Sequence, residues 1–181
     1  MIWLILGLAL WWGAHLFKRI APEARARMGD RAKGPVALAL VVSIVLMVIG
    51  YRATGGPIWW GRTPMLTGIN NLLVLLAFYL FAASGMKTGV TRLTRHPQLI
   101  GFSLWAVAHL LVNGDAESVV LFGGLLLWAV AEMVVISRAA GPYVPPHPVP
   151  VKREVMAVVG ALVVFAVVAG IHILLGVNPF G

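Results

Sequence analysis

Three histidines, His15, His109 and His172, lie inside long apolar stretches of this 181-residue chain. Two more, His96 and His147, lie in connections rich in basic residues or proline. An ionisable side chain in hydrocarbon is costly and by default marks a functional hypothesis. Imidazole is a common metal ligand and a usual axial ligand of haem iron, so the three are candidate cofactor ligands. The alternative is that each only hydrogen-bonds a neighbouring helix or a backbone carbonyl.

The depth of each histidine in its stretch indicates which two could bind one iron atom. At about 1.5 Å rise per helical residue, His109 and His172 lie roughly 9 Å and roughly 6 Å from one end of their expected spans. By the same rise of about 1.5 Å, His15 lies roughly 8 Å from the opposite end of its span. Two axial ligands of one iron must lie at the same depth, so this estimate favours the pair His109 and His172.

Other polar residues in the apolar stretches are Glu132, Asn70 and Asn71. A carboxyl group in hydrocarbon is protonated or paired, so Glu132 is either a proton donor or a helix-to-helix hydrogen bond, and we favour the second. The two asparagines are expected to make polar contacts between helices.

The composition is that of an integral membrane protein. Hydrophobic residues make up 60% and charged residues 11% of the chain, and the mean hydropathy is +0.93. Soluble domains have about 45–50% apolar and about 25% charged residues. We therefore expect an all-α, polytopic membrane helix bundle of about six transmembrane helices, with residues 1–181 as a single domain. The chain has no cysteine, which excludes thiolate ligands and Cys nucleophiles.

Six apolar stretches are long enough to cross a bilayer or nearly so. A proline-rich connection, Arg138–Glu154, cannot be a regular helix because each proline removes a donor and blocks a turn. The expected spans are Met1–Ile20, Pro35–Tyr51, Leu66–Met86, Leu99–Asn113, Ala116–Ser137 and Val155–Leu175.

The basic residues are distributed unequally between the two ends of the expected bundle. Of the 14 Lys and Arg residues, all but Arg52 and Arg62 belong to the first, third and fifth connections and their flanks. Lys and Arg mark cytoplasmic loops, which places both termini outside the cell. The net charge of +8 fits contact with anionic lipid headgroups, so the lipid bilayer rather than nucleic acid is the expected partner.

The run Thr91–Asp115, TRLTRHPQLIGFSLWAVAHLLVNGD, resembles the central motif of the NnrU family of bacterial membrane proteins. The first span around Gly13–Leu16 and the ending Ile171–Pro179 are similar to that family as well. The resemblance covers essentially the whole chain. It implies an inner-membrane protein associated with nitric oxide and nitrite metabolism in denitrifying bacteria.

The same motif is similar to that of the zeta-carotene isomerases, membrane enzymes that use haem b to isomerise an apolar polyene. This resemblance implies haem b with His15 and His109 as metal ligands, whereas the depth estimate adds His172 as a cofactor-binding residue. We give the motif more weight, because span ends are only estimated. Ala106 stands where the isomerases have a cysteine, so redox-linked ligand exchange through that sulfur is impossible in this chain.

Two functions follow from these resemblances. The first is a haem-dependent, isomerase-like protein that acts on an apolar small molecule or on nitric oxide. The second is a non-enzymatic assembly or scaffold factor for respiratory denitrification enzymes, in which the histidines only join helices.

A third, weaker resemblance is to membrane methyltransferases that bind S-adenosylmethionine. It rests on Arg95–Pro97 and Gly101, but Leu99 stands where those enzymes have a tyrosine, and no acidic cluster follows the fifth span. The simpler interpretation is a basic juxtamembrane anchor with Pro97 in the first turn of the fourth span.

The charge distribution predicts which connections face the cytoplasm. Reporter domains fused after Gly34 and after Pro150 should be active in the cytoplasm, and one fused after Gly114 should be active outside. The opposite pattern of reporter activity would contradict the expected orientation.

Overall fold

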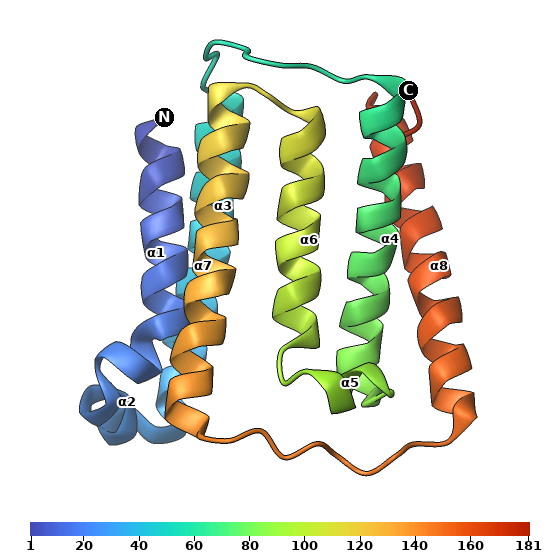
Figure 1. The fold of residues 1–181 in the computed structure, drawn as a ribbon. Coiled ribbons are helices and arrows are strands. Elements are labelled where there is room, and N and C mark those ends of the chain that lie inside the picture. The colour runs from blue at the N-terminus through green and yellow to red at the C-terminus, as the bar shows by residue number, and fades with distance from the viewer.

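The computed structural model describes residues 1–181, and its regular elements are all helical (Figure 1). This confirms the all-α class. The elements are α1 (Ile2–Ile20), α2 (Pro22–Met28), the 3-10 turn η1 (Gly29–Ala32), α3 (Lys33–Arg52), α4 (Pro64–Met86), α5 (Val90–Leu93), α6 (Pro97–Val112), α7 (Ala116–Ala140) and α8 (Val151–Leu174).

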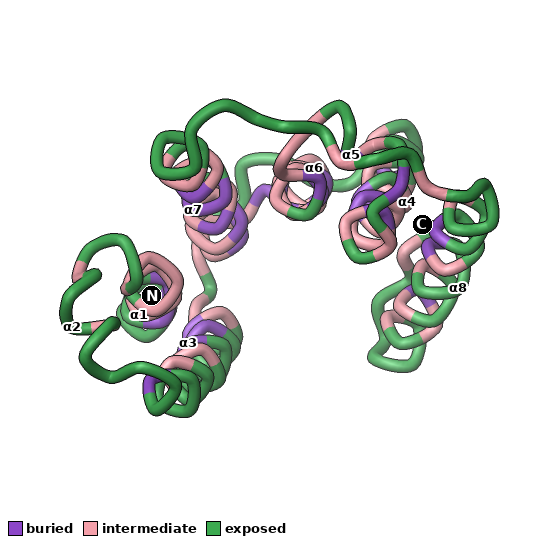
Figure 2. Tube along the Cα trace, turned by 90° about the horizontal axis from the view of Figure 1, so that it is seen from below, coloured by how far each residue is buried: buried purple, intermediate pink, exposed green.

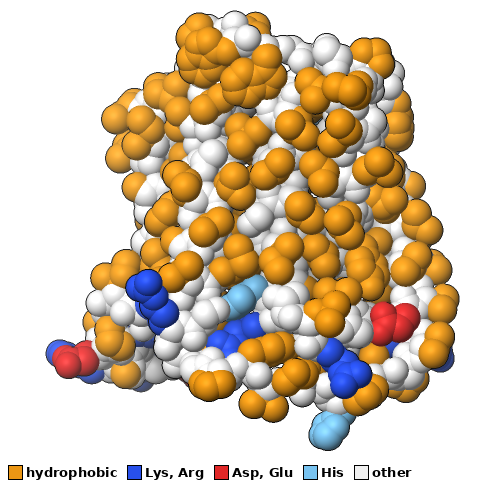
Figure 3. Space-filling model, in the orientation of Figure 1, with side chains coloured by type: hydrophobic (Ala, Val, Ile, Leu, Met, Phe, Trp, Pro, Cys, Tyr) orange, Lys and Arg blue, Asp and Glu red, His pale blue; other side chains and the backbone are white.

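Each of the six expected spans corresponds to one of the longer helices: α1, α3, α4, α6, α7 and α8. Four helical segments are long and apolar enough to cross a membrane: the continuous stretch Pro22–Arg52, which ends in α3, and helices α4, α7 and α8. Helix α6 is apolar but shorter, with 16 residues. Apolar side chains dominate the outer surface (Figure 3), as expected for a protein in a lipid bilayer.

The helix boundaries differ from the expected ones at a few places. Helix α8 begins at Val151 rather than Val155, directly after Pro150, the last proline of the α7–α8 connection. The basic connection after α1 holds the short helices α2 and η1, which were not predicted; Pro22 lies in the first turn of α2, where a missing N–H costs nothing. Residues 141–150 contain no helix, so the expectation for the proline-rich connection Arg138–Glu154 holds for its middle. Its two ends, residues 138–140 and 151–154, are helical and belong to α7 and α8.

The long helices form a single curved layer in the order α3, α1, α7, α6, α4, α8 (Figure 2). Helix α6 lies in the middle of this arc, between α7 and α4. The two termini lie at one end of the bundle, and the basic connections lie at the other (Figures 1 and 3). We call these the terminal end and the basic end.

Small residues let neighbouring helices approach closely. A Cβ atom added to Gly101 of α6 would lie 2.8 Å from the Ala77 carbonyl oxygen of α4 and 3.1 Å from the Leu80 Cβ. Ala77 and Ala108 are fully buried on the two sides of this contact. Helix association in lipid depends on such van der Waals packing, because lipid tails are as apolar as the side chains.

Gly101→Ala should therefore destabilise the bundle by about 1–3 kcal/mol, the usual cost of overpacking. Unfolding in mixed micelles, followed by circular dichroism, would measure the loss. Gly123→Ala in α7 is the matched control, because a Cβ there meets nothing within 4 Å. Equal stability of the two variants would contradict the close α4–α6 contact.

Candidate functional site

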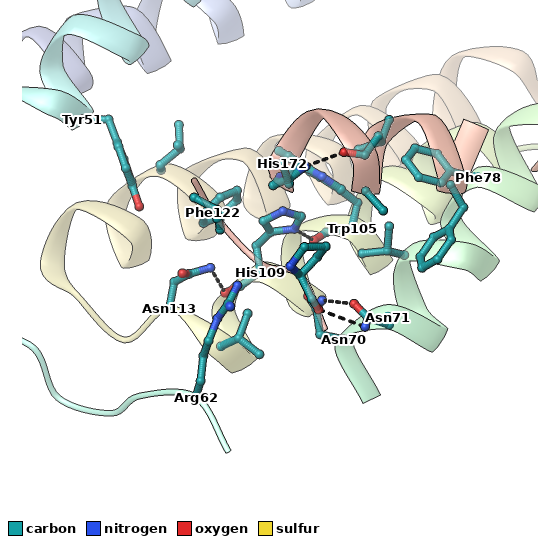
Figure 4. Close-up of a pocket in the computed structure, with 18 residues that line it drawn as sticks. Tyr51, Arg62, Asn70, Asn71, Phe78, Trp105, His109, Asn113, Phe122 and His172 are labelled. Atoms are coloured by element: carbon teal, nitrogen blue, oxygen red, sulfur yellow. Dashed lines mark hydrogen bonds between the residues drawn. The ribbon is translucent and has the colours of Figure 1, made fainter. Parts of the chain in front are cut away.

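A cavity of about 480 Å³ lies near the terminal end and is lined by residues from helices across the arc, from α3 to α8; Figure 4 shows its lining side chains. Its volume is in the range of about 300–1,000 Å³ typical of small-molecule sites. Five helices, two connections and the C-terminal segment provide its 18 lining residues: Tyr51, Arg62, Asn70, Asn71, Val74, Phe78, Trp105, His109, Val112, Asn113, Leu121, Phe122, Phe165, Val168, Ala169, His172, Val177 and Pro179.

His109 of α6 and His172 of α8 both line this cavity (Figure 4). The Nδ1 atom of His109 is 2.9 Å from the Trp105 carbonyl oxygen, and the Nδ1 atom of His172 is 2.8 Å from the Val168 carbonyl oxygen. A carbonyl oxygen only accepts, so Nδ1 donates in each case. In a neutral imidazole this leaves the Nε2 lone pair free to bind a metal.

Aromatic rings form the wall beside His109. Its ring centroid lies 4.7 Å from that of Phe122 and 4.9 Å from that of Trp105. Phe78 and Phe165 line the cavity from α4 and α8. Flat apolar side chains of this kind exclude water and suit a planar apolar ligand.

Polar groups close the cavity at the terminal end. The amide nitrogen of Asn71 donates to the Pro179 carbonyl oxygen at 3.0 Å, which holds the C-terminal segment next to α4. The side-chain nitrogen of Asn113 donates to the His109 carbonyl oxygen at 2.9 Å, and the indole of Trp60 donates to the Leu110 carbonyl oxygen at 2.8 Å. The Trp60 bond satisfies a carbonyl group at the end of α6, where no further helical turn follows. The Asn113 side chain adds to the bond that its own backbone N–H donates to the His109 carbonyl oxygen at 3.0 Å.

Sequence reasoning did not identify this polar end. Arg62 was counted only for orientation, and the segment around Asn178 was not assigned to a site. The sequence held one indication of a role for Arg62: it is one of only two basic residues outside the basic connections. The remaining contacts come from loops, whose positions no helical periodicity predicts.

His15 lies outside the cavity, in an aromatic cluster between α1, α6 and α7. Its ring centroid is 4.2 Å from that of Trp11 and 4.5 Å from that of Trp128. Phe102 contacts Trp128 at 5.1 Å between centroids and continues the cluster toward Trp105. The structure thus brings His109 and His172 to one cavity and leaves aromatic side chains between His15 and His109.

The other intramembrane polar residues have different surroundings. Glu132 of α7 is buried, but it makes no hydrogen bond to another helix, so the favoured helix-to-helix bond is not found. Asn70 does join two helices: in the orientation that satisfies its amide, the nitrogen donates to the Ala108 carbonyl oxygen of α6 at 2.9 Å.

Arg95 and His96 attach the α7–α8 connection at the basic end. The Arg95 guanidinium donates to the carbonyl oxygens of Gly141 at 2.8 Å and Pro142 at 2.9 Å. The His96 Nε2 atom lies 2.8 Å from the Ser137 hydroxyl. Burial and the neighbouring Arg95 charge lower the pKa of His96, which favours the neutral imidazole. Both side chains are thus used in contacts within the chain.

Comparison with known proteins identifies a family and a curated relative of this chain. The model of the family described as "NnrU protein" matches residues 3–179. The 15-cis-zeta-carotene isomerase, chloroplastic, of Zea mays is 28% identical over 110 residues, which cover 50% of this chain and 30% of that protein. The chain therefore matches less than a third of that relative's length. No solved structure matches the chain.

The contacts of Arg95 predict that Arg95→Ala loosens the α7–α8 connection. Each lost hydrogen bond contributes about 1 kcal/mol, so limited chymotrypsin cleavage after Tyr143, which lies in this connection, should become at least about fivefold faster. Arg92→Ala is the control, because Arg92 is exposed and its side chain makes no hydrogen bond. Equal cleavage rates in both variants would contradict this role.

Proposed function

The chain belongs to the NnrU family, and we propose that it is a membrane haem protein that holds haem b between His109 and His172. The observation that carries this proposal is the placement of both imidazoles in one cavity, each with Nδ1 on a carbonyl of its own helix. A hydrogen bond from the ring nitrogen that does not bind the metal fixes the ring and raises its basicity as a ligand.

The cavity residues fit a planar, mainly apolar group. Two imidazoles are a donor set that haem b accepts, and the rings of Trp105, Phe122 and Phe165 supply apolar walls. When bound, haem supplies an iron centre for electron exchange or for polarising a reactant, and the protein contributes ligation and a dry pocket.

The reactant in this proposal is an apolar small molecule that enters from the bilayer. Isomerisation of a polyene is supported by the similarity to the isomerase of Zea mays, which covers half of this chain. Nitric oxide, the reactant expected from the resemblance to the NnrU family, is also small and uncharged. In the same proposal the protein lies in the bacterial inner membrane, with its basic end in the cytoplasm.

The proposal predicts a specific pattern of visible spectra. Protein purified in detergent after haem-replete expression should show a Soret band and sharp reduced α and β bands. His109→Ala and His172→Ala should each abolish the bis-imidazole spectrum, because each removes one axial ligand. His147→Ala, in the exposed α7–α8 connection, is the control and should leave the spectrum unchanged.

His15→Ala distinguishes the two ligand pairs. It should leave the spectrum in place if His172 is the partner of His109. Loss of the spectrum in His15→Ala but not in His172→Ala would replace the proposed pair with His15 and His109. A featureless spectrum in the unmodified protein would contradict haem binding and leave the non-enzymatic assembly role.

A further inference from the structure

Arg62 is the one charged side chain among the residues that line the cavity. One guanidinium nitrogen donates to the Asn178 carbonyl oxygen at 2.7 Å, and no carboxylate forms an ion pair with it. A guanidinium has five N–H donors, so most of them are not used by the protein. The bond to Asn178 joins Arg62 to the C-terminal segment that borders the cavity.

A guanidinium at the edge of an apolar cavity favours a ligand that has an apolar body and an anionic group. Its apolar body would lie against Trp105 and Phe122, and its anionic group would lie at the terminal end with Arg62. Arg binds carboxylates with paired, directional hydrogen bonds. No acidic side chain lines this cavity, so the anion has to come from the ligand.

An arginine near a membrane surface also binds lipid phosphate, and this is the simpler explanation of Arg62. The contacts of Arg62 favour a ligand in the cavity over a lipid headgroup. Its guanidinium is bonded to the C-terminal segment over the cavity, and its neighbour Trp60 is bonded to α6. These two bonds hold the 54–63 connection against the site.

We propose that Arg62 binds a carboxylate on the ligand in this cavity, and that the ligand class is a planar apolar molecule with a carboxylate edge. This inference rests on the proposed function, since haem b belongs to that class through its propionates. It adds a specificity residue to the site: Arg62 selects the carboxylate edge, and the imidazoles of His109 and His172 select the metal. The two contributions can be measured separately, because a metal-free porphyrin keeps the carboxylates and lacks the iron.

The experiment measures binding of four probes to the full chain in phosphatidylcholine nanodiscs, by absorbance and by quenching of tryptophan fluorescence. The probes are haem b, protoporphyrin IX and the dimethyl ester of each. The variants are Arg62→Gln and, as a matched control, Arg52→Gln, because Arg52 is the other basic residue away from the basic connections and does not line the cavity.

The unmodified chain and Arg52→Gln should bind each free acid at least about tenfold more tightly than its ester, the effect of one hydrogen bond to a charged group. Arg62→Gln should bind acid and ester equally, with the ester affinity unchanged. The inference is overturned if Arg62→Gln keeps the preference, or if the unmodified chain binds acid and ester equally. The second result would assign Arg62 to lipid headgroups.

A double variant that combines His109→Ala and His172→Ala tests this inference separately from the proposed function. The double variant should lose its preference for haem over protoporphyrin IX and keep its preference for acid over ester. If the unmodified chain prefers free acids but binds haem and protoporphyrin IX equally, the proposed iron ligation fails and the role of Arg62 stands. If none of the four probes binds, both fail.

Discussion

The cavity depends on how closely α6 approaches α4. Gly101 has no room for a Cβ beside the Ala77 carbonyl, and Ala108, which is buried and directly precedes His109, continues the contact. This packing, together with the hydrogen bond from Asn70 to Ala108, holds α6 at the middle of the arc. His109 therefore faces α8 across a cavity rather than facing lipid (Figure 4).

The three intramembrane histidines share one hydrogen-bond pattern. His15, His109 and His172 each direct Nδ1 to the carbonyl oxygen four residues earlier. This bond reduces the cost of an imidazole in hydrocarbon, so it serves a purely structural histidine and a metal ligand equally well. The difference lies at Nε2: His109 and His172 line a cavity, whereas His15 packs among Trp11 and Trp128.

Sequence reasoning predicted the helices well and their arrangement only in part. The apolar runs and the proline-rich connection marked the helices, because hydrocarbon permits few alternatives to a helix. Helix order in the arc was not predictable, since it depends on small-residue contacts such as Gly101 with Ala77. The depth estimate paired His109 with His172, which both line one cavity, whereas the family motif, to which we gave more weight, paired His109 with His15. Arg62 and Asn178 meet through loops that carry no periodic signal.

The shortness of α6 has a consequence for the surrounding lipid. Its 16 residues extend about 24 Å, against about 30 Å for the hydrocarbon core of a bilayer, while its neighbours α4 and α7 have 23 and 25 residues. Such hydrophobic mismatch thins the adjacent leaflets. We expect the bilayer to be locally thinner beside α6, so that lipid headgroups lie closer to the cavity. A molecule dissolved in the leaflet would then reach the opening of the cavity by lateral diffusion.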